Sequence, residues 1–104
     1  MITARTQLLA LHDTSAQEAK AIMVAKNADY GASQDALRNF RLCEMLSIPM
    51  DQGILTRLGD KLARIGNLIA KGTNEVKDES IEDTIIDAVN YLIILRATIQ
   101  EHRQ

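Results

Sequence analysis

The feature that most constrains the fold of this 104-residue chain is an apolar stretch near its end that carries two regularly spaced aspartates. At 100° per residue, a helix through residues 79–91 places Asp83, Asp87 and Asn90 on one narrow stripe. Much of the remaining helix surface is apolar: Ile81, Ile85, Ala88, Val89, Leu92, Leu95 and Ile99. Because burying an uncompensated carboxylate is very costly, we expect the stripe to face a cation, a metal ion or a wet cleft.

The rest of the chain also favours helices, packed in one domain over residues 1–104. Aromatic residues make up only 3% of the sequence and Trp is absent, so the core must consist of Leu, Ile, Val, Met and Ala. The pattern predicts helices over about 13–28, 34–46, 51–70 and 80–101, with residues 1–12 as an N-terminal arm or a short helix. Short turns between four helices predict an all-α, antiparallel bundle.

Local signals mark where these helices begin and end. The first helix is expected to begin at one of three possible N-cap residues in 13–15 and to end at Gly31. Pro49 breaks the chain before the third helix and places Asp51 in the first turn of that helix. Gly72 is expected to end the third helix, and Asp78 or Ser80 is expected to cap the fourth.

The predicted third helix has three distinct faces. An apolar stripe comprises Ile54, Leu58, Leu62, Ile65 and Ile69, a small-residue stripe comprises Gly59, Ala63, Gly66 and Ala70, and a polar stripe comprises Arg57, Asp60, Arg64, Asn67 and Lys71. A glycine inside a helix costs about 1 kcal/mol relative to alanine. Two such glycines predict that a backbone or a ligand approaches closely on that side, unless the helix simply tolerates them.

The charged residues of the third and fourth helices allow two interpretations. Asp60 lies among the cations Arg57, Lys61 and Arg64, and the stripe of the fourth helix carries the acids Asp83 and Asp87. One interpretation is an ion-pair network that holds the two helices in register. The other is a Mg²⁺-phosphate site, because hard divalent ions take oxygen ligands. Asp83 and Asp87, with Asp60 or Glu79, would then hold the metal, and Lys61, Arg64 or Lys26 would contact phosphate oxygens.

A second group of polar and aromatic residues surrounds the predicted end of the first helix. Tyr30 and Phe40 are two of the three aromatic residues in the chain, and aromatic faces can stack a nucleobase. Asn39, Asn90 or Asn27 could then recognise the edge of the base. Ordinary helix capping by residues 26–31 remains the alternative.

Charge and cysteine content exclude several classes of partner. A net charge of −2 argues against binding of DNA or RNA duplexes, so a small partner is expected. The longest apolar run, Tyr91 to Leu95, is too short to span a membrane, and the N-terminus shows no signal peptide. The single Cys43 allows no internal disulfide and fits a reducing compartment. We therefore expect a cytoplasmic protein.

Four blocks of residues, in order, resemble the nucleotide modification associated domain 1 family. They are Lys26-Asn27-Ala28-Asp29-Tyr30-Gly31, Asn39-Phe40, Arg57 to Arg64 with Asn67-Leu68, and Glu79 to Thr84 with Asp87 and Asn90-Tyr91. That family is similar to the all-α nucleoside triphosphate pyrophosphohydrolases of the MazG and dimeric dUTPase type, and it occurs in phages and bacteria. The resemblance implies a four-helix MazG-like bundle completed by self-association into a homo-oligomer, with a nucleotide bound through Mg²⁺.

Carried over to this sequence, the resemblance implies a nucleotide site that includes Asp29 and Tyr91 beside the residues above. The wider superfamily holds its metal with an ExxE and an ExxD motif. At the position of the ExxE motif, this sequence has only one acid, Asp60, among cations. At the position of the ExxD motif it reads Thr84-Ile85-Ile86-Asp87, and Asp83 directly precedes Thr84.

Three functions follow from this pattern. The first is Mg²⁺-dependent hydrolysis of a nucleoside triphosphate, with Asp60, Asp83 and Asp87 as the catalytic residues. The second is a non-catalytic protein, of a kind found in phages, that sequesters a nucleotide such as a cyclic signalling nucleotide. The third is a structural helical oligomer.

Overall fold

The computed structural model describes residues 4–29, 37–72, 75–76 and 79–102. This part of the chain forms four helices, α1 (Arg5–Asp29), α2 (Arg38–Met45), α3 (Met50–Lys71) and α4 (Ile81–His102). Two short strands, β1 (Glu75–Val76) and β2 (Glu79–Ser80), pair antiparallel where the sequence predicts a loop. The all-α fold class is therefore confirmed, with one minimal strand pair added. No described helix is long and apolar enough to cross a membrane.

The helix α1 belongs to a compact unit of residues 1–32, separate from the unit formed by residues 33–104. It begins at Arg5, so the predicted start at residues 13–15 is wrong. The Thr14 hydroxyl donates a hydrogen bond to the Ala10 carbonyl over 3.0 Å, as a threonine inside a helix can. That bond satisfies the side chain without a cap, and the helix continues through it. The predicted stop at Gly31 lies outside the described residues.

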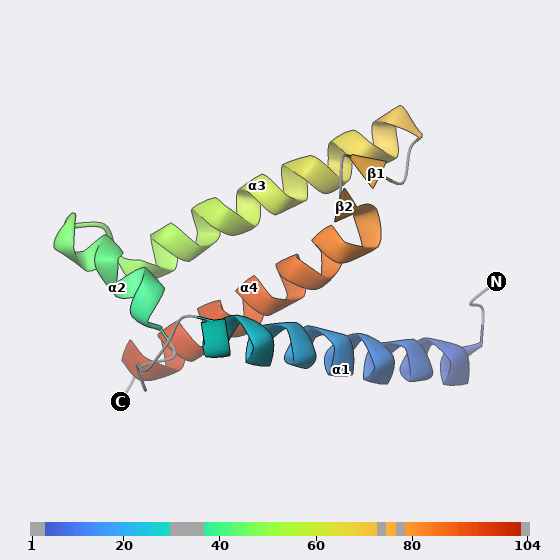
Figure 1. Ribbon diagram of the computed structural model, residues 1–104, viewed down its shortest axis with the longest axis horizontal. Helices are drawn as coiled ribbons and strands as arrows, with labels where there is room; N and C mark the ends of the chain where they lie inside the picture. The colour runs from blue at the N-terminus through green and yellow to red at the C-terminus, as the bar shows by residue number, and fades with distance from the viewer. Residues whose placement is uncertain (1–3, 30–36, 73–74, 77–78, 103–104) are drawn as a thin grey trace. The chain divides into compact units, whose positions relative to one another are not determined.

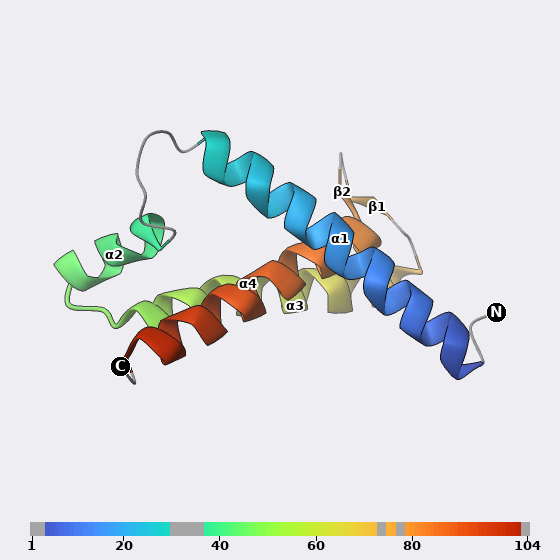
Figure 2. The ribbon, with the colours of Figure 1, turned by 90° about the horizontal axis from the view of Figure 1, so that it is seen from below.

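In the second unit, α3 and α4 form an antiparallel hairpin, with α2 at the end opposite to β1 and β2 (Figures 1 and 2). Met50, Ile54 and Leu68 of α3 are at most 1% exposed. The helix α3 packs against α4, whose buried residues include Thr84 and Thr98. Each threonine hydroxyl donates to the carbonyl four residues earlier, so neither polar group is buried without a partner.

The ends of α3 and α4 follow the signals in the sequence. Pro49 precedes α3, and Asp51 lies in the first turn. Gly72 ends the helix in the left-handed conformation, with φ of 68°, which costs glycine little. Ser80 caps α4, because its hydroxyl oxygen accepts a hydrogen bond of 3.0 Å from the Asp83 backbone N–H. These four predictions are confirmed.

The helix α2 ends at Met45, one residue before the predicted end, and none of its residues is fully buried. The predicted start at residue 34 lies outside the described residues. Three large apolar residues in or directly after α2 are exposed: Leu42, Met45 and Leu46. Side chains of α2 contact both helices of the hairpin. Arg41 forms a bidentate ion pair with Glu101 of α4, at 2.7 and 3.1 Å. Cys43 lies against Gly53 of α3, where a Cβ would come within 2.6 Å of the thiol sulfur.

The predicted faces of α3 also need correction. Leu62 and Ile69, expected in the buried stripe, are 56% and 66% exposed. Leu68 and Met50 are buried in their place, because the core-facing side of the helix is centred closer to these two positions. Within the described residues, a Cβ at Gly59 or Gly66 would meet nothing within 4 Å. The close approach predicted for the small-residue stripe therefore does not come from this part of the chain.

Candidate functional site

An ion pair between α3 and α4 lies at the centre of the candidate site. The Lys61 Nζ is 3.3 Å from an Asp87 carboxylate oxygen, and the two side chains are 25% and 18% exposed. The charges are therefore partly shielded from water, which strengthens their attraction relative to a surface pair. Asp87 thus faces a protein cation, one of the three partners expected for the acidic stripe.

Further charges flank this pair on the same faces of the two helices. Arg57 and Arg64 lie four residues before and three residues after Lys61, so helix geometry puts all three cations on one stripe of α3. Both arginines are exposed. On α4, the exposed Asp83 lies one turn before Asp87. The side of the hairpin next to the ion pair is therefore lined by cations from α3 and by acids from α4.

An aromatic pair lies one helical turn beyond the ion pair. Tyr91 follows Asp87 by four residues on α4, and its ring meets Phe40 of α2 edge to face, with centroids 6.3 Å apart and ring planes at 81°. Both rings are partly exposed, and Asn39 beside Phe40 is exposed. Asn90 is 9% exposed on the same stripe of α4. The ion pair therefore joins α3 to α4, and the aromatic pair joins α2 to α4 one helical turn further along α4.

The remaining predicted site residues divide into three groups. Asp60 is exposed on α3 beside Lys61. Lys26 lies in the last turn of α1, in the other compact unit. Tyr30 and the side chains of Asp29 and Glu79 lie outside the described part of the structure. Their predicted roles stay predictions.

The donor set for a metal ion is limited in this part of the structure. Among the described residues, no group of three or more His, Cys, Asp or Glu side chains could together hold a metal ion. Asp83 and Asp87 are one turn apart, but Asp87 already contacts Lys61. Assignment of Asp60, Asp83, Asp87 and Glu79 as a shared Mg²⁺ site stays a prediction.

Two contacts between these residues could not be predicted from the sequence. Lys61 contacts Asp87 directly, whereas the sequence showed Lys61 only as one of three cations near Asp60. Phe40 pairs with Tyr91, whereas the sequence suggested Phe40 and Tyr30 as the aromatic residues that could stack a base. Helical spacing within one element carries no information about either contact, because each joins two different helices. The arrangement provides a row of three cations that can bind an anion, next to the rings of Phe40 and Tyr91.

Comparison with known proteins agrees with the resemblance seen in the sequence. Residues 26–100 match the family described as nucleotide modification associated domain 1. No curated protein and no solved structure gives a significant match. The matched region contains α2, α3 and all but the last two residues of α4, and with them the ion pair and the aromatic pair. Since the match covers most of its length, this chain belongs to the nucleotide modification associated domain 1 family.

Proposed function

We propose that this protein binds a nucleotide on the side of the α3–α4 hairpin that carries Lys61 and Asp87. The observation that supports the proposal best is the Lys61–Asp87 pair itself, which joins a row of three cations to an aromatic pair one turn away. One turn of helix is about 5.4 Å, a separation that a single nucleotide can bridge between phosphate and base. The description of the family, which refers to nucleotide modification, is consistent with such a ligand.

The phosphate groups would contact the cations of α3. Arg57 and Arg64 can each donate two hydrogen bonds to phosphate oxygens, and Lys61 can contribute a point charge. An incoming phosphate would compete with the Asp87 carboxylate for the Lys61 ammonium group. Asp87 therefore sets the affinity of the site by occupying its central cation in the absence of a ligand.

The base would contact Phe40 and Tyr91. An edge-to-face pair leaves part of each ring face without an aromatic partner, and stacking of a base on such a face contributes about 1–3 kcal/mol. Asn39 is exposed next to Phe40 and can hydrogen-bond to the edge of a base.

Hydrolysis of a nucleoside triphosphate, as in the MazG-type pyrophosphohydrolases, is the second candidate function. Asp83 and Asp87 favour it, since two carboxylates one turn apart can share a divalent ion. The described donors do not form a three-carboxylate metal centre, so we derive no hydrolytic step from them. Simple sequestration of a nucleotide, in the cytoplasm of a bacterial or phage-infected cell, requires only the cations and the aromatic pair.

Two variants with opposite expected effects test the binding proposal. Asp87→Asn removes the competing charge, so the affinity for a nucleotide should rise several-fold. Lys61→Met keeps the apolar stem but removes the cation, so the affinity should fall about tenfold or more. Titration calorimetry with canonical nucleoside triphosphates and cyclic dinucleotides, each with and without Mg²⁺, measures both effects. Arg96→Met is the matched control, because Arg96 is nine residues and half a rotation away from Asp87 on α4.

The outcome also separates binding from metal-dependent catalysis. If Asp87 holds a metal ion, Asp87→Asn should weaken Mg²⁺-dependent binding and abolish release of pyrophosphate. Product release that survives Asp87→Ala would contradict the catalytic role predicted for Asp87. If no nucleotide binds or changes under any condition, both the binding and the hydrolysis proposals are wrong.

A further inference from the structure

Two of the residues proposed to contact the base, Asn39 and Phe40, belong to the short helix α2. None of the eight residues of α2 is fully buried, so burial of its own side chains contributes little to its position. An edge-to-face ring pair depends on the distance and the angle between the rings. The orientation of α2 therefore decides whether Phe40 can act together with Tyr91 on one ligand.

Two neighbouring side chains of α2 contact α4 at well-separated points. The ring of Phe40 meets the ring of Tyr91. The guanidinium group of Arg41 donates hydrogen bonds to both carboxylate oxygens of Glu101, at 3.1 and 2.7 Å. Tyr91 and Glu101 are ten residues apart, which separates them by about 15 Å along α4. A single contact would let α2 rotate about that point, whereas two contacts this far apart define its orientation relative to α4.

The pair between Arg41 and Glu101 is suited to fixing an orientation. Its two parallel hydrogen bonds align the guanidinium plane with the carboxylate, which a lysine ammonium group would not do. The Nη1 atom of Arg41 also lies 4.0 Å from the sulfur of the buried Met50, so Arg41 contacts α3 and α4 at once. Neither partner of the pair belongs to the four blocks that resemble the family, and Glu101 lies beyond the matched residues 26–100.

We infer that Arg41 and Glu101 are positioning residues for recognition of the base, an inference that rests on the nucleotide-binding proposal above. Their ion pair orients α2 so that Phe40 meets Tyr91 before a nucleotide arrives, and the exposed side chain of Asn39 is oriented with it. A surface that already has the bound arrangement loses less conformational entropy on binding. The ion pair thus raises the affinity for the base without touching the ligand.

The exposure of the ion pair limits how much it can contribute. Arg41 and Glu101 are 38% and 40% exposed, and exposed pairs contribute up to about 1 kcal/mol. Loss of the pair can therefore lower the affinity for a nucleotide by at most about fivefold. The phosphate groups would contact the cations of α3, whose positions do not depend on α2. The expected change is therefore in the preference for a base.

Two variants with opposite changes of charge test the positioning role. Arg41→Met removes a cation and Glu101→Gln removes an acid, so a purely electrostatic influence would change the affinity for an anion in opposite directions. Titration calorimetry with ATP, GTP, CTP and UTP, and with inorganic triphosphate, gives the base preference as the ratio of nucleotide affinity to inorganic triphosphate affinity. Both variants should lower this ratio by about two- to fivefold for the nucleotide that the wild-type protein binds most tightly.

Two variants around Arg41 separate its geometry from its charge. Arg41→Lys keeps the charge but loses the planar fork, so it should also lower the base preference. Glu44→Gln removes an acid that lies 3.9 Å from Arg41 on α2 itself. Because that contact does not join α2 to α4, Glu44→Gln should leave the base preference unchanged.

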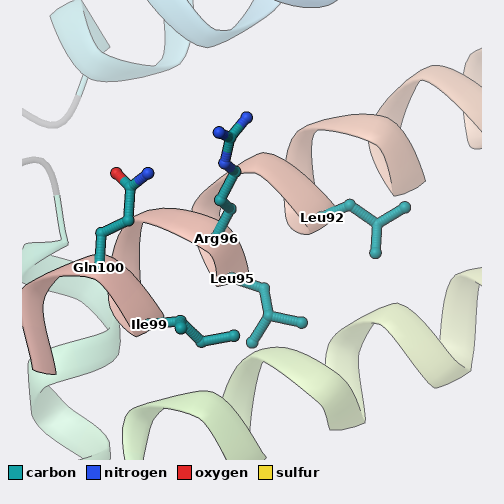
Figure 3. A pocket seen from close by; sticks show the side chains of 5 residues that line it. All are labelled: Leu92, Leu95, Arg96, Ile99 and Gln100. Carbon is teal, nitrogen blue, oxygen red and sulfur yellow. The ribbon is translucent and has the colours of Figure 1, made fainter. Parts of the chain in front are cut away.

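Arg96→Met is the matched control for loss of a cation near the end of α4. Arg96 is five residues before Glu101 and points in a direction about 140° away from it. It points to the opposite side of α4 from Leu95 and Ile99 (Figure 3). These residues line a hollow of about 340 Å³, together with Leu92 and Gln100. Arg96→Met should leave the base preference unchanged.

The ring pair also gives a readout that needs no ligand, because Phe40 is the single phenylalanine of the chain. In protein with ¹³C-labelled Phe and Tyr rings, nuclear Overhauser contacts between Phe40 and Tyr91 should be present in the wild type. They should weaken in Arg41→Met and Glu101→Gln and persist in the two controls. Circular dichroism checks that each variant is folded, and if one variant of the pair is unfolded, the other and Arg41→Lys decide.

Different results overturn the positioning role and the nucleotide-binding proposal. If the wild-type protein prefers a nucleotide over inorganic triphosphate, four results overturn the positioning role alone. These are an unchanged base preference in Arg41→Met and Glu101→Gln, opposite changes in the two, an equal loss in Glu44→Gln or Arg96→Met, and ring contacts that persist in both variants of the pair. Equal binding of nucleotides and inorganic triphosphate by the wild type overturns the positioning role together with the base contacts. If the wild type binds no nucleotide and no inorganic triphosphate, both proposals are wrong.

Discussion

Removal of either partner of the Lys61–Asp87 pair should measurably destabilise the protein. At 3.3 Å, two unit charges attract each other by about 5 kcal/mol at an effective dielectric constant of about 20. Desolvation of both groups offsets most of that attraction. The side chains are 25% and 18% exposed, so the pair falls between surface pairs, worth up to about 1 kcal/mol, and buried pairs that cost about 3–5 kcal/mol when broken. We therefore expect a coupling energy of about 1–2 kcal/mol.

A double-mutant cycle isolates this coupling from the other contacts of the two residues. Lys61→Met and Asp87→Asn keep the size of each side chain, and the free energy of unfolding of both single variants, the double variant and the wild type is measured by urea denaturation. The measurement is made at a fixed protein concentration, because self-association would also contribute to stability. Repetition in 1 M salt should reduce the coupling only slightly, since partly buried charges are poorly screened.

A coupling energy below about 0.3 kcal/mol would contradict this reasoning. The pair would then behave as a fully solvated surface contact. Asp87 would no longer need Lys61 to compensate its charge, and the expected gain in nucleotide affinity on Asp87→Asn would lose its physical basis.

Two further predictions concern the attachment of α2. Gly53→Ala should destabilise the protein by about 1–2 kcal/mol, because the new Cβ would lie 2.6 Å from the Cys43 sulfur. In a Cys43→Ala background that sulfur is absent. The same substitution should then stabilise the protein by up to about 1 kcal/mol, because alanine has a higher helix propensity than glycine. Urea denaturation of the four proteins measures both effects, and equal effects in the two backgrounds would show that the sulfur is not the obstacle. Arg41→Met should lower the unfolding free energy by at most about 1 kcal/mol in low salt, since Arg41 and Glu101 are 38% and 40% exposed, and 1 M salt should largely abolish the difference from wild type. A decrease of more than about 2 kcal/mol in the unfolding free energy would contradict the interpretation of the Arg41–Glu101 pair as a weak surface ion pair.

Much of the local structure could be predicted from the sequence because its causes are local. Gly72 ends α3 since glycine adopts a positive φ at little cost, and Ser80 caps α4 through an acceptor three residues from the bonded N–H. The same approach failed at Thr14, where a hydroxyl that could cap a helix bonds inside it instead. Both outcomes are compatible with the same residue type, so local chemistry alone could not choose between them.

For the candidate site, the sequence by itself determined that Asp87 on an otherwise apolar helix needed a compensating partner, and that cations on α3 were available. Only the tertiary structure decided that Lys61 is the cation in contact with it, and that Phe40 meets Tyr91. It also decided that Leu62 and Ile69 are exposed, although they are as apolar as the buried Leu68. Periodicity places residues on one face of a helix, but which face meets the neighbouring helix depends on how the two helices are rotated against each other.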